Sequence, residues 1–240
     1  MLSGNLEHDL EQLVDISRRA GLAILEWYKG DMGITQKADD SPLTKADLAS
    51  HKLITAELTE QWPEIPVLSE ESAEIPWETR QKWQQYWLVD PLDGTKEFIN
   101  RNGEFTVNIA LIQHHKPVLG IVHVPVTDIS YFGAKDFGAW RQQGSETAAA
   151  IEVRQPSAEP AVIVGSRSHA NPELASQLNQ LGPHELVSMG ISIKFCRVAE
   201  GLADFYPRMG PTCEWDTAAA QAVVEAAGGQ VVKIDGSALA

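Results

Sequence analysis

Cysteine is scarce in this chain of 240 residues, and the short motifs of several common enzyme classes are missing. Cys196 and Cys213 are the only cysteines, which rules out a disulfide framework, and no cysteine and histidine spacing typical of a zinc site is present. The sequence also has no G-x-S-x-G elbow, no P-loop and no H-E-x-x-H pattern. It therefore gives no support to a serine hydrolase of the elbow type, a P-loop protein or a zinc peptidase.

Long apolar runs are absent as well. The segment 161–164 is typical of the longest, far below the ~20 residues that a membrane-spanning helix needs. The first nine residues contain neither the basic nor the apolar region of a signal peptide. We therefore expect a cytoplasmic protein, a monomer or a homodimer, whose membrane contact is at most peripheral, on the cytoplasmic face of the inner membrane.

Positive charge is also in short supply, because 19 Lys and Arg stand against 33 Asp and Glu, for a net charge of −14. Without a basic stripe the chain cannot neutralise a phosphate backbone, which argues against a nucleic acid polymer as partner. A small anionic substrate would also be repelled unless a metal ion supplied positive charge locally. The hydrophobic content of 43% is ordinary for a globular protein with a substantial core.

The most informative segment is 87–95, in which an apolar strand leads into the sequence D-P-L-D-G-T. The strand can hold Asp90 and Asp93 side by side, where two carboxylates repel one another unless a cation lies between them. Mg²⁺ favours oxygen ligands of this kind. The N–H groups of Gly94 and Thr95 begin a short predicted helix, and such a position attracts phosphate. The segment thus combines metal and phosphate recognition.

Two simpler explanations of this segment compete with a metal site. Asp, Pro and Gly are common in turns, so the pattern alone is compatible with an ordinary turn. An EF-hand calcium loop is excluded, because twelve positions counted from Asp90 end on Arg101 instead of a glutamate. Counted from Asp93, the loop ends on Glu104 but has Phe98 where glycine is required. The choice between a turn and a metal site depends on further carboxylates.

Three such carboxylates stand at the ends of predicted elements. Asp47 lies in the first turn of a helix that Thr44 caps, Asp216 opens an alanine-rich helix, and Glu70 follows the short strand 67–68. Asp47 and Asp216 each have an ordinary explanation too, as a charge that favours the helix dipole or as a helix cap. Together with Asp90 and Asp93 these residues could supply the oxygens that two Mg²⁺ ions need.

The hydrophobic pattern predicts an α+β first half and an α/β second half, joined by a linker over 155–160, with domains at 1–155 and 156–240. Asp235-Gly236 is a hairpin signal, so a returning strand is expected after it, although only four residues follow. The predicted helices cover 6–27, 45–58, 172–181, 195–203 and 217–227, and the predicted strands cover 67–68, 105–112, 118–126, 129–132, 161–164, 205–206 and 230–234.

Three motifs in this order resemble the inositol monophosphatase superfamily of Mg²⁺-dependent, lithium-sensitive phosphomonoesterases. They are E-E at 70–71, D-P-L-D-G-T at 90–95, and W-D-T-A at 215–218 before an Ala/Gly-rich helix. Within the superfamily, residues 94–99, 166–169 and 194–196 are most similar to the bacterial 3'(2'),5'-bisphosphate nucleotidases. Those enzymes remove the 3'-phosphate from adenosine 3',5'-bisphosphate, a by-product of sulfate assimilation. The resemblance covers nearly the whole chain and implies an α/β fold, a layered αβαβα sandwich.

The resemblance also implies a role for each motif residue. Glu70, Asp90 and the Leu92 carbonyl oxygen would hold one metal ion, and Asp90, Asp93 and Asp216 would hold a second. A further, weaker ion near Glu70 would bring the total to two or three Mg²⁺ ions, with Mn²⁺ as an alternative. Members of the family continue past residue 236 with another strand, whose nucleotide contacts are therefore in question for this chain.

The remaining implied roles concern water and substrate. Thr95, oriented by Asp47, would position and deprotonate the attacking water, and the Gly94 and Thr95 N–H groups would hold the phosphate. Ser168, His169 and Lys194 would bind the second phosphate and the sugar of the nucleotide. The expected catalytic residues are therefore Asp47, Glu70 and Thr95, and the expected substrate-binding residues are Glu70, Leu92, Asp93, Gly94, Thr95, Ser168, His169, Lys194 and Asp216.

Two alternative functions remain open at this stage. One is an inositol-1-phosphate phosphatase with the same metal centre, against which Lys194 and the Ser168-His169 pair favour a substrate with a second phosphate. The other is a binding module that senses a metal ion or a nucleotide without hydrolysis. The Asp47 and Thr95 pair argues against it, because a pure binding protein has no need of a pair that activates water.

Overall fold

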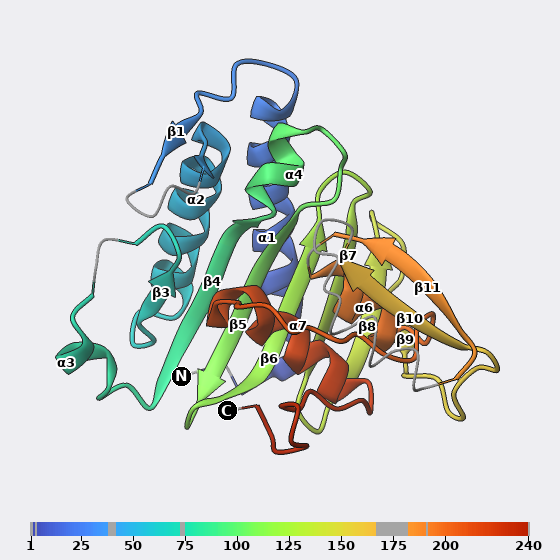
Figure 1. Ribbon diagram of the computed structural model, residues 1–240. Helices are drawn as coiled ribbons and strands as arrows, with labels where there is room; N and C mark the ends of the chain where they lie inside the picture. The colour runs from blue at the N-terminus through green and yellow to red at the C-terminus, as the bar shows by residue number, and fades with distance from the viewer. Residues whose placement is uncertain are drawn as a thin grey trace.

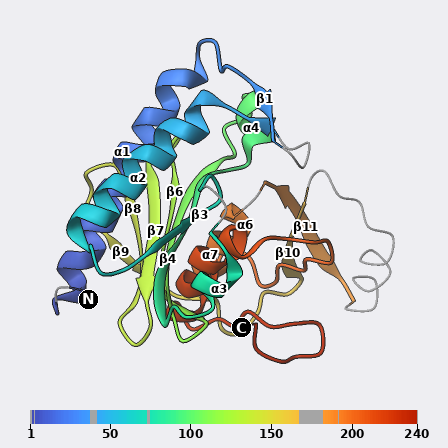
Figure 2. The ribbon, with the colours of Figure 1, turned by 90° about the vertical axis from the view of Figure 1, so that its left-hand side faces the viewer.

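Helices and sheets alternate in layers in the computed structural model, which describes residues 2, 4–37, 42–72, 75–166, 182–190 and 192–239. A seven-stranded sheet lies between two pairs of helices, and a two-stranded sheet lies outside the second pair (Figure 2). The helices on one face are α1 (Leu6–Tyr28) and α2 (Lys45–Gln61), and those on the other are α6 (Ile193–Ala199) and α7 (Glu214–Ala226). Two short helices, α3 (Trp77–Arg80) and α4 (Thr95–Ile99), follow β3 and β4.

The large sheet runs in chain order from β3 to β9, with β3 parallel to β4 and all other neighbours antiparallel. Its strands are β3 (Val67–Ser69), β4 (Gln85–Asp93), β5 (Thr106–Gln113), β6 (Lys116–Val124), β7 (Ile129–Ala134), β8 (Gly138–Gln143) and β9 (Ala149–Ile151). The outer pair, β10 (Ala161–Ser166) and β11 (His184–Met189), is parallel, and the small pair, β1 (Thr35–Gln36) and β2 (Pro42–Leu43), is antiparallel.

Side chains of the large sheet alternate between two apolar cores, as strand geometry requires. On β4, Trp87 and Val89 belong to the core beneath α1 and α2, whereas Leu88 belongs to the core beneath α7. Asp90 continues this second row toward α7. By strict alternation a residue three positions further along would point to the opposite face.

An irregularity in β4 changes that outcome for Asp93. Asp90 pairs with Asn108 and Asp93 pairs with Thr106, so three steps along β4 match two steps along β5. The extra residue is a β-bulge, which shifts the alternation by one position. Asp93 therefore shares the α7 face with Asp90, while Leu92 packs into the opposite core. Gly94 follows with φ of 95° and ends the strand in a conformation that favours glycine.

Helix α7 crosses the same face at very short range (Figure 1). A Cβ atom added to Gly120 on β6 would lie 2.1 Å from the carbonyl oxygen of Ala219. Small residues on both elements let the helix backbone approach the sheet, and the buried residues 217–224 of α7 include four alanines. This close contact fixes the first turn of α7, which carries Asp216, over the end of β4.

The α/β sandwich expected from the sequence is confirmed. The helices over 6–27 and 45–58 were located well, and Thr44 forms the expected capping box with Asp47. Strands β1, β2, β8, β9 and β11 were not expected from the sequence. The predicted strands over 205–206 and 230–234 are wrong, because the described residues there form only isolated bridges, Phe205 with Ile163 and Val232 with Ala238. The predicted helix 172–181 lies outside the described residues, and the boundary at 155, between β9 and β10, stays a prediction.

We expect Gly120→Ala to destabilise the protein by about 1–3 kcal/mol, because the added Cβ must push α7 away from the sheet. Urea unfolding followed by circular dichroism measures the change. Gly210→Ala is the matched control, since a Cβ at Gly210 meets no atom within 4 Å. Equal midpoints for both variants would contradict the tight contact between Gly120 and Ala219.

Candidate metal centre and active site

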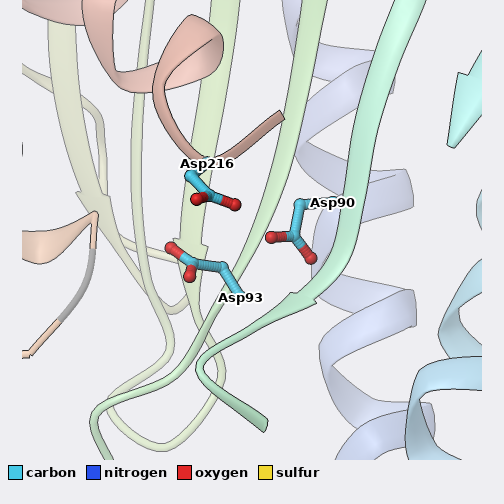
Figure 3. Close-up of side chains that lie close together, drawn as sticks. All are labelled: Asp90, Asp93 and Asp216. Atoms are coloured by element: carbon cyan, nitrogen blue, oxygen red, sulfur yellow. The ribbon is translucent and has the colours of Figure 1, made fainter. Parts of the chain in front are cut away.

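Three carboxylates from two distant parts of the chain face a common space at the end of β4 (Figure 3). One carboxylate oxygen each from Asp90, Asp93 and Asp216 lie within 4.8 Å of one another. Asp90 and Asp93 come from the two sides of the β-bulge, and Asp216 comes from the first turn of α7. Such a group of oxygens matches the preference of hard divalent cations.

The acid in the first turn of α7 is fixed by the helix start itself. Asp216 is the third residue of the helix, and its Oδ2 accepts hydrogen bonds from the Cys213 N–H at 3.0 Å and the Thr212 hydroxyl at 2.9 Å. The cap therefore orients the carboxylate and does not compete with a role at the site. The helix-cap explanation of Asp216 and the metal-ligand explanation are both compatible with this geometry.

Asp93 is held by a buried network on the other side of the site. Ser192 lies immediately before α6, and its hydroxyl lies 2.6 Å and its N–H 3.3 Å from Asp93 Oδ2. The Asn108 amide donates to the same oxygen at 3.3 Å, and Thr106 holds that amide in turn. With Oδ2 engaged by these donors, the other oxygen of Asp93 is left to face Asp90 and Asp216.

Crowding of acids is reflected in the pKa values at the site. Burial raises the pKa of the Asp90 carboxyl well above its usual range, and repulsion from Asp93, Glu70 and Asp216 adds to the effect. Burial likewise raises the pKa of Asp93 to about 6, against the opposing hydrogen bonds from Ser192 and Asn108. The cluster is therefore an unfavourable place for several negative charges, and a bound cation would relieve that strain.

Thr95 and Asp47 form a hydrogen-bonded pair beside the carboxylates. The Thr95 hydroxyl donates to Asp47 Oδ1 at 3.1 Å, and the Leu92 carbonyl oxygen lies 3.4 Å from the same hydroxyl. Asp47 Oδ2 accepts from the N–H and the hydroxyl of Thr44 in the capping box. Burial raises the pKa of Asp47, although its hydrogen bonds with Thr44 and Thr95 act in the opposite direction.

Glu70 follows β3 directly, and its carboxylate is paired with a lysine side chain. Its Oε1 accepts a hydrogen bond at 2.7 Å from the ammonium of Lys37, which also contacts Glu71 at 2.5 Å. Burial lowers the pKa of Lys37, but the hydrogen bonds to Glu70 and Glu71 outweigh it and raise the pKa above the usual value. Glu70 thus lines the cleft with its carboxylate already paired to the ammonium of Lys37.

An open cleft of ≈ 590 Å³ joins these groups to a second region. Lys194 is 2% exposed, and its ammonium lies 5.0 Å from the centre of the Tyr206 ring. Phe195 packs edge-on against the same ring. The exposed Arg208 also lines the cleft, so the region beyond the carboxylates offers aromatic surface and two cations. The cleft is lined by residues 42, 70, 90, 92–97, 192, 194, 195, 206, 208, 212, 216 and 217.

Most of the residues singled out from the sequence meet in this cleft. Its lining includes Glu70, Asp90, Leu92, Asp93, Gly94, Thr95, Lys194 and Asp216, and Asp47 reaches it through Thr95. Ser168 and His169 lie outside the described residues. Three further residues of the site, Ser192, Asn108 and Lys37, were not expected from the sequence. A serine before a helix, an asparagine within a strand and a loop lysine carry no local signal of such roles, so only their long-range contacts identify them.

Comparison with known proteins places this arrangement in a family. The family model described as "Inositol monophosphatase family" matches residues 5–240. The chain is 53% identical to the 3'(2'),5'-bisphosphate nucleotidase CysQ of Escherichia coli O6:H1, over 92% of this chain and 89% of the relative. It is 51% identical to CysQ of Salmonella typhimurium, over 96% of this chain and 92% of the relative. The chain belongs to the inositol monophosphatase family, whose enzymes are generally metal-dependent.

Solved structures agree with this assignment. The crystal structure of CysQ from Bacteroides thetaiotaomicron superposes with a TM-score of 0.81 at 42% identity, covering 93% of this chain and 89% of that one. An inositol monophosphatase from Anabaena, at 23% identity, shares the fold with a TM-score of 0.76. Within the described part of the chain, no helix has the length and apolarity to cross a bilayer.

We expect Ser192→Ala to weaken metal binding by roughly tenfold, because Asp93 would lose the hydroxyl that orients its carboxylate. Isothermal titration calorimetry with Mn²⁺ measures the affinity, and Ser192→Thr, which keeps a hydroxyl, is expected to restore most of it. Ser130→Ala is the matched control, because Ser130 is equally buried but contacts His123, away from the cleft. An unchanged affinity in Ser192→Ala would contradict the orienting role.

Proposed function

We propose that this protein is a metal-dependent phosphomonoesterase that removes the 3'-phosphate of adenosine 3',5'-bisphosphate, giving AMP and phosphate. The observation that carries the proposal is the acidic cluster of Asp90, Asp93 and Asp216 next to the Thr95 and Asp47 pair. The 53% identity to a nucleotidase of that specificity supports the choice of substrate. Such an activity would support sulfate assimilation by removing a by-product.

The donor set fits Mg²⁺. The three side chains of the acidic cluster, Asp90, Asp93 and Asp216, all offer carboxylate oxygens, and Mg²⁺ is a hard cation that binds oxygen. Asp90, Asp93 and Asp216 would hold one ion, and Glu70, Asp90 and the Leu92 carbonyl oxygen would hold another, with Mn²⁺ as a substitute. Bound metal ions would supply positive charge for the phosphate dianion, activation of water and stabilisation of the leaving oxygen.

The residues of the chain would then position and deprotonate the nucleophile. The Thr95 hydroxyl donates a hydrogen bond to Asp47 Oδ1, so the lone pairs of its oxygen are free to accept a proton from a water molecule. Asp47 can receive the Thr95 proton, and burial makes it a stronger base than an exposed aspartate. The N–H groups of Gly94 and Thr95 would hold the phosphate. In-line attack by water needs no covalent protein nucleophile.

The far side of the cleft would select the nucleotide. Lys194 and Arg208 supply positive charge for a second phosphate group, and the rings of Tyr206 and Phe195 offer flat apolar surface for the rest of the molecule. Ser168 and His169 are proposed to contribute to the same contacts. A substrate with a single phosphate, such as inositol 1-phosphate, would leave these cations without an anionic partner.

Parallel assays of phosphate release test the proposal. With Mg²⁺ present, we expect the bisphosphate to be hydrolysed with a kcat/KM roughly tenfold or more above that of inositol 1-phosphate, because only the bisphosphate engages both ends of the cleft. Asp93→Asn should release no phosphate from either ester, which controls for contaminating phosphatases. Faster turnover of inositol 1-phosphate would favour that ester as the substrate. No Mg²⁺-dependent release from either would favour a binding module.

The pH dependence of KM tests the role of Lys194. Burial lowers the pKa of Lys194 to about 8, with Asp93 acting in the opposite direction. The ammonium is therefore charged below that pH and loses its charge as the pH rises through it. We expect KM for the bisphosphate to increase several-fold between about pH 7 and about pH 9, where phosphate itself stays charged. In Lys194→Met, KM should be high at both pH values, and a wild-type slope there would contradict the assignment.

A further inference from the structure

Lys37 occupies an unusual place for a lysine in so acidic a site. It follows β1, and its side chain, 19% exposed, reaches Glu70 and Glu71 at the edge of the cleft. Glu70 is 26% exposed and lines the cleft, whereas Glu71 is 6% exposed and lies deeper. Among the described residues, no other lysine or arginine forms an ion pair with a carboxylate of the cleft.

Electrostatics places this ammonium in competition with a metal ion. Lys37 lies 2.7 Å from Glu70 Oε1, the distance of a direct hydrogen bond. A divalent ion bound by Glu70 would stand within a few ångströms of that ammonium, and two cations so close repel one another strongly at a partly buried site. Glu71 offers a position to which the ammonium can withdraw without leaving the protein, since it already binds Lys37.

We propose that Lys37 is a tethered cation that neutralises Glu70 and Glu71 in the absence of metal and moves onto Glu71 alone when an ion binds Glu70. This inference rests on the proposed role of Glu70 as a metal ligand. Its consequence is that Lys37 lowers the affinity of the Glu70 ion relative to that of the ion held by Asp93 and Asp216. Lys37 thereby keeps one metal position exchangeable and protects the metal-free protein from uncompensated negative charge.

Metal titration of a neutral variant tests the competition. In Lys37→Met we expect the weaker class of Mn²⁺ sites, measured by calorimetry on chelator-treated protein, to bind roughly tenfold more tightly, as removal of a unit charge beside a partly exposed ligand predicts. Lys52→Met removes the same charge from an exposed position on α2 and should leave the affinity unchanged. Unchanged or weaker binding in Lys37→Met would overturn the proposal.

Thermal unfolding distinguishes competition between Lys37 and a metal ion for Glu70 from a purely structural ion pair. If Lys37 stands in for a metal ion, Lys37→Met lowers Tm in the presence of a chelator, and saturating Mg²⁺ removes the difference from the wild type. A structural ion pair would lower Tm by the same amount under both conditions, and that result would overturn the proposal.

A measurement on the wild type avoids dependence on the variant. Acetylation of lysines, followed by mass spectrometry, reports how freely each amine is exposed. We expect the labelling rate of Lys37 to rise several-fold when Mg²⁺ is added to the chelator-treated protein, because its amine is then held by one carboxylate instead of two, while that of Lys52 stays constant. A Lys37 rate that does not respond, in protein that binds Mg²⁺, would overturn the inference alone. Wild-type protein that binds no divalent ion would overturn the proposed function as well.

Discussion

Repulsion between buried carboxylates is the constraint on which the rest of the site depends. Four acids, Asp47, Asp90, Asp93 and Asp216, are brought to one end of a sheet, although like charges at this distance oppose folding. The structure resolves the conflict in the same way for three of them. Asp47, Asp93 and Asp216 each engage Oδ2 with donors of the fold, a helix cap or a buried serine and amide, which leaves the other oxygen for the site. Stability and function therefore use different atoms of the same side chain.

Backbone geometry makes this arrangement possible. The β-bulge in β4 turns Asp93 onto the face of Asp90, which regular alternation would forbid. The close approach of α7 to Gly120 then sets Asp216 above both. Neither the β-bulge nor the contact between α7 and Gly120 is proposed to touch a substrate, yet each determines where a carboxylate lies. The proposed metal centre therefore depends on how strand β4 ends and on how closely α7 packs on the sheet, as well as on the carboxylate side chains themselves.

This origin explains what the sequence could and could not predict. The acids at the ends of elements were found, because a strand followed by D-P-L-D-G-T and a capping box are local patterns. Ser192 and Lys37 were missed, because the first meets Asp93 from 99 residues away and the second meets Glu70 across 33 residues. Strand β8 begins with glycine and ends in Arg-Gln-Gln, so it gives no clear apolar alternation. The apolar segment 230–234 looked like a strand, but among the described residues it has only a single bridge as partner.

Ser192 also indicates how metal chemistry and substrate choice can be separated within one fold. Its hydroxyl contacts Asp93, and α6 begins at the next residue and carries Lys194 into the cleft. The carboxylate side of the cleft comes from β4 and α7, whereas the far side comes from α6 and the segment after it, with Tyr206 and Arg208. Changes in that second set can alter which phosphate ester fits while the carboxylates keep their donors. A distant inositol monophosphatase with the same fold at 23% identity is therefore no evidence for a shared substrate. In this chain, the proposed preference for a molecule with two phosphates rests on the buried Lys194, and the two rings beside it offer surface for the rest of that molecule.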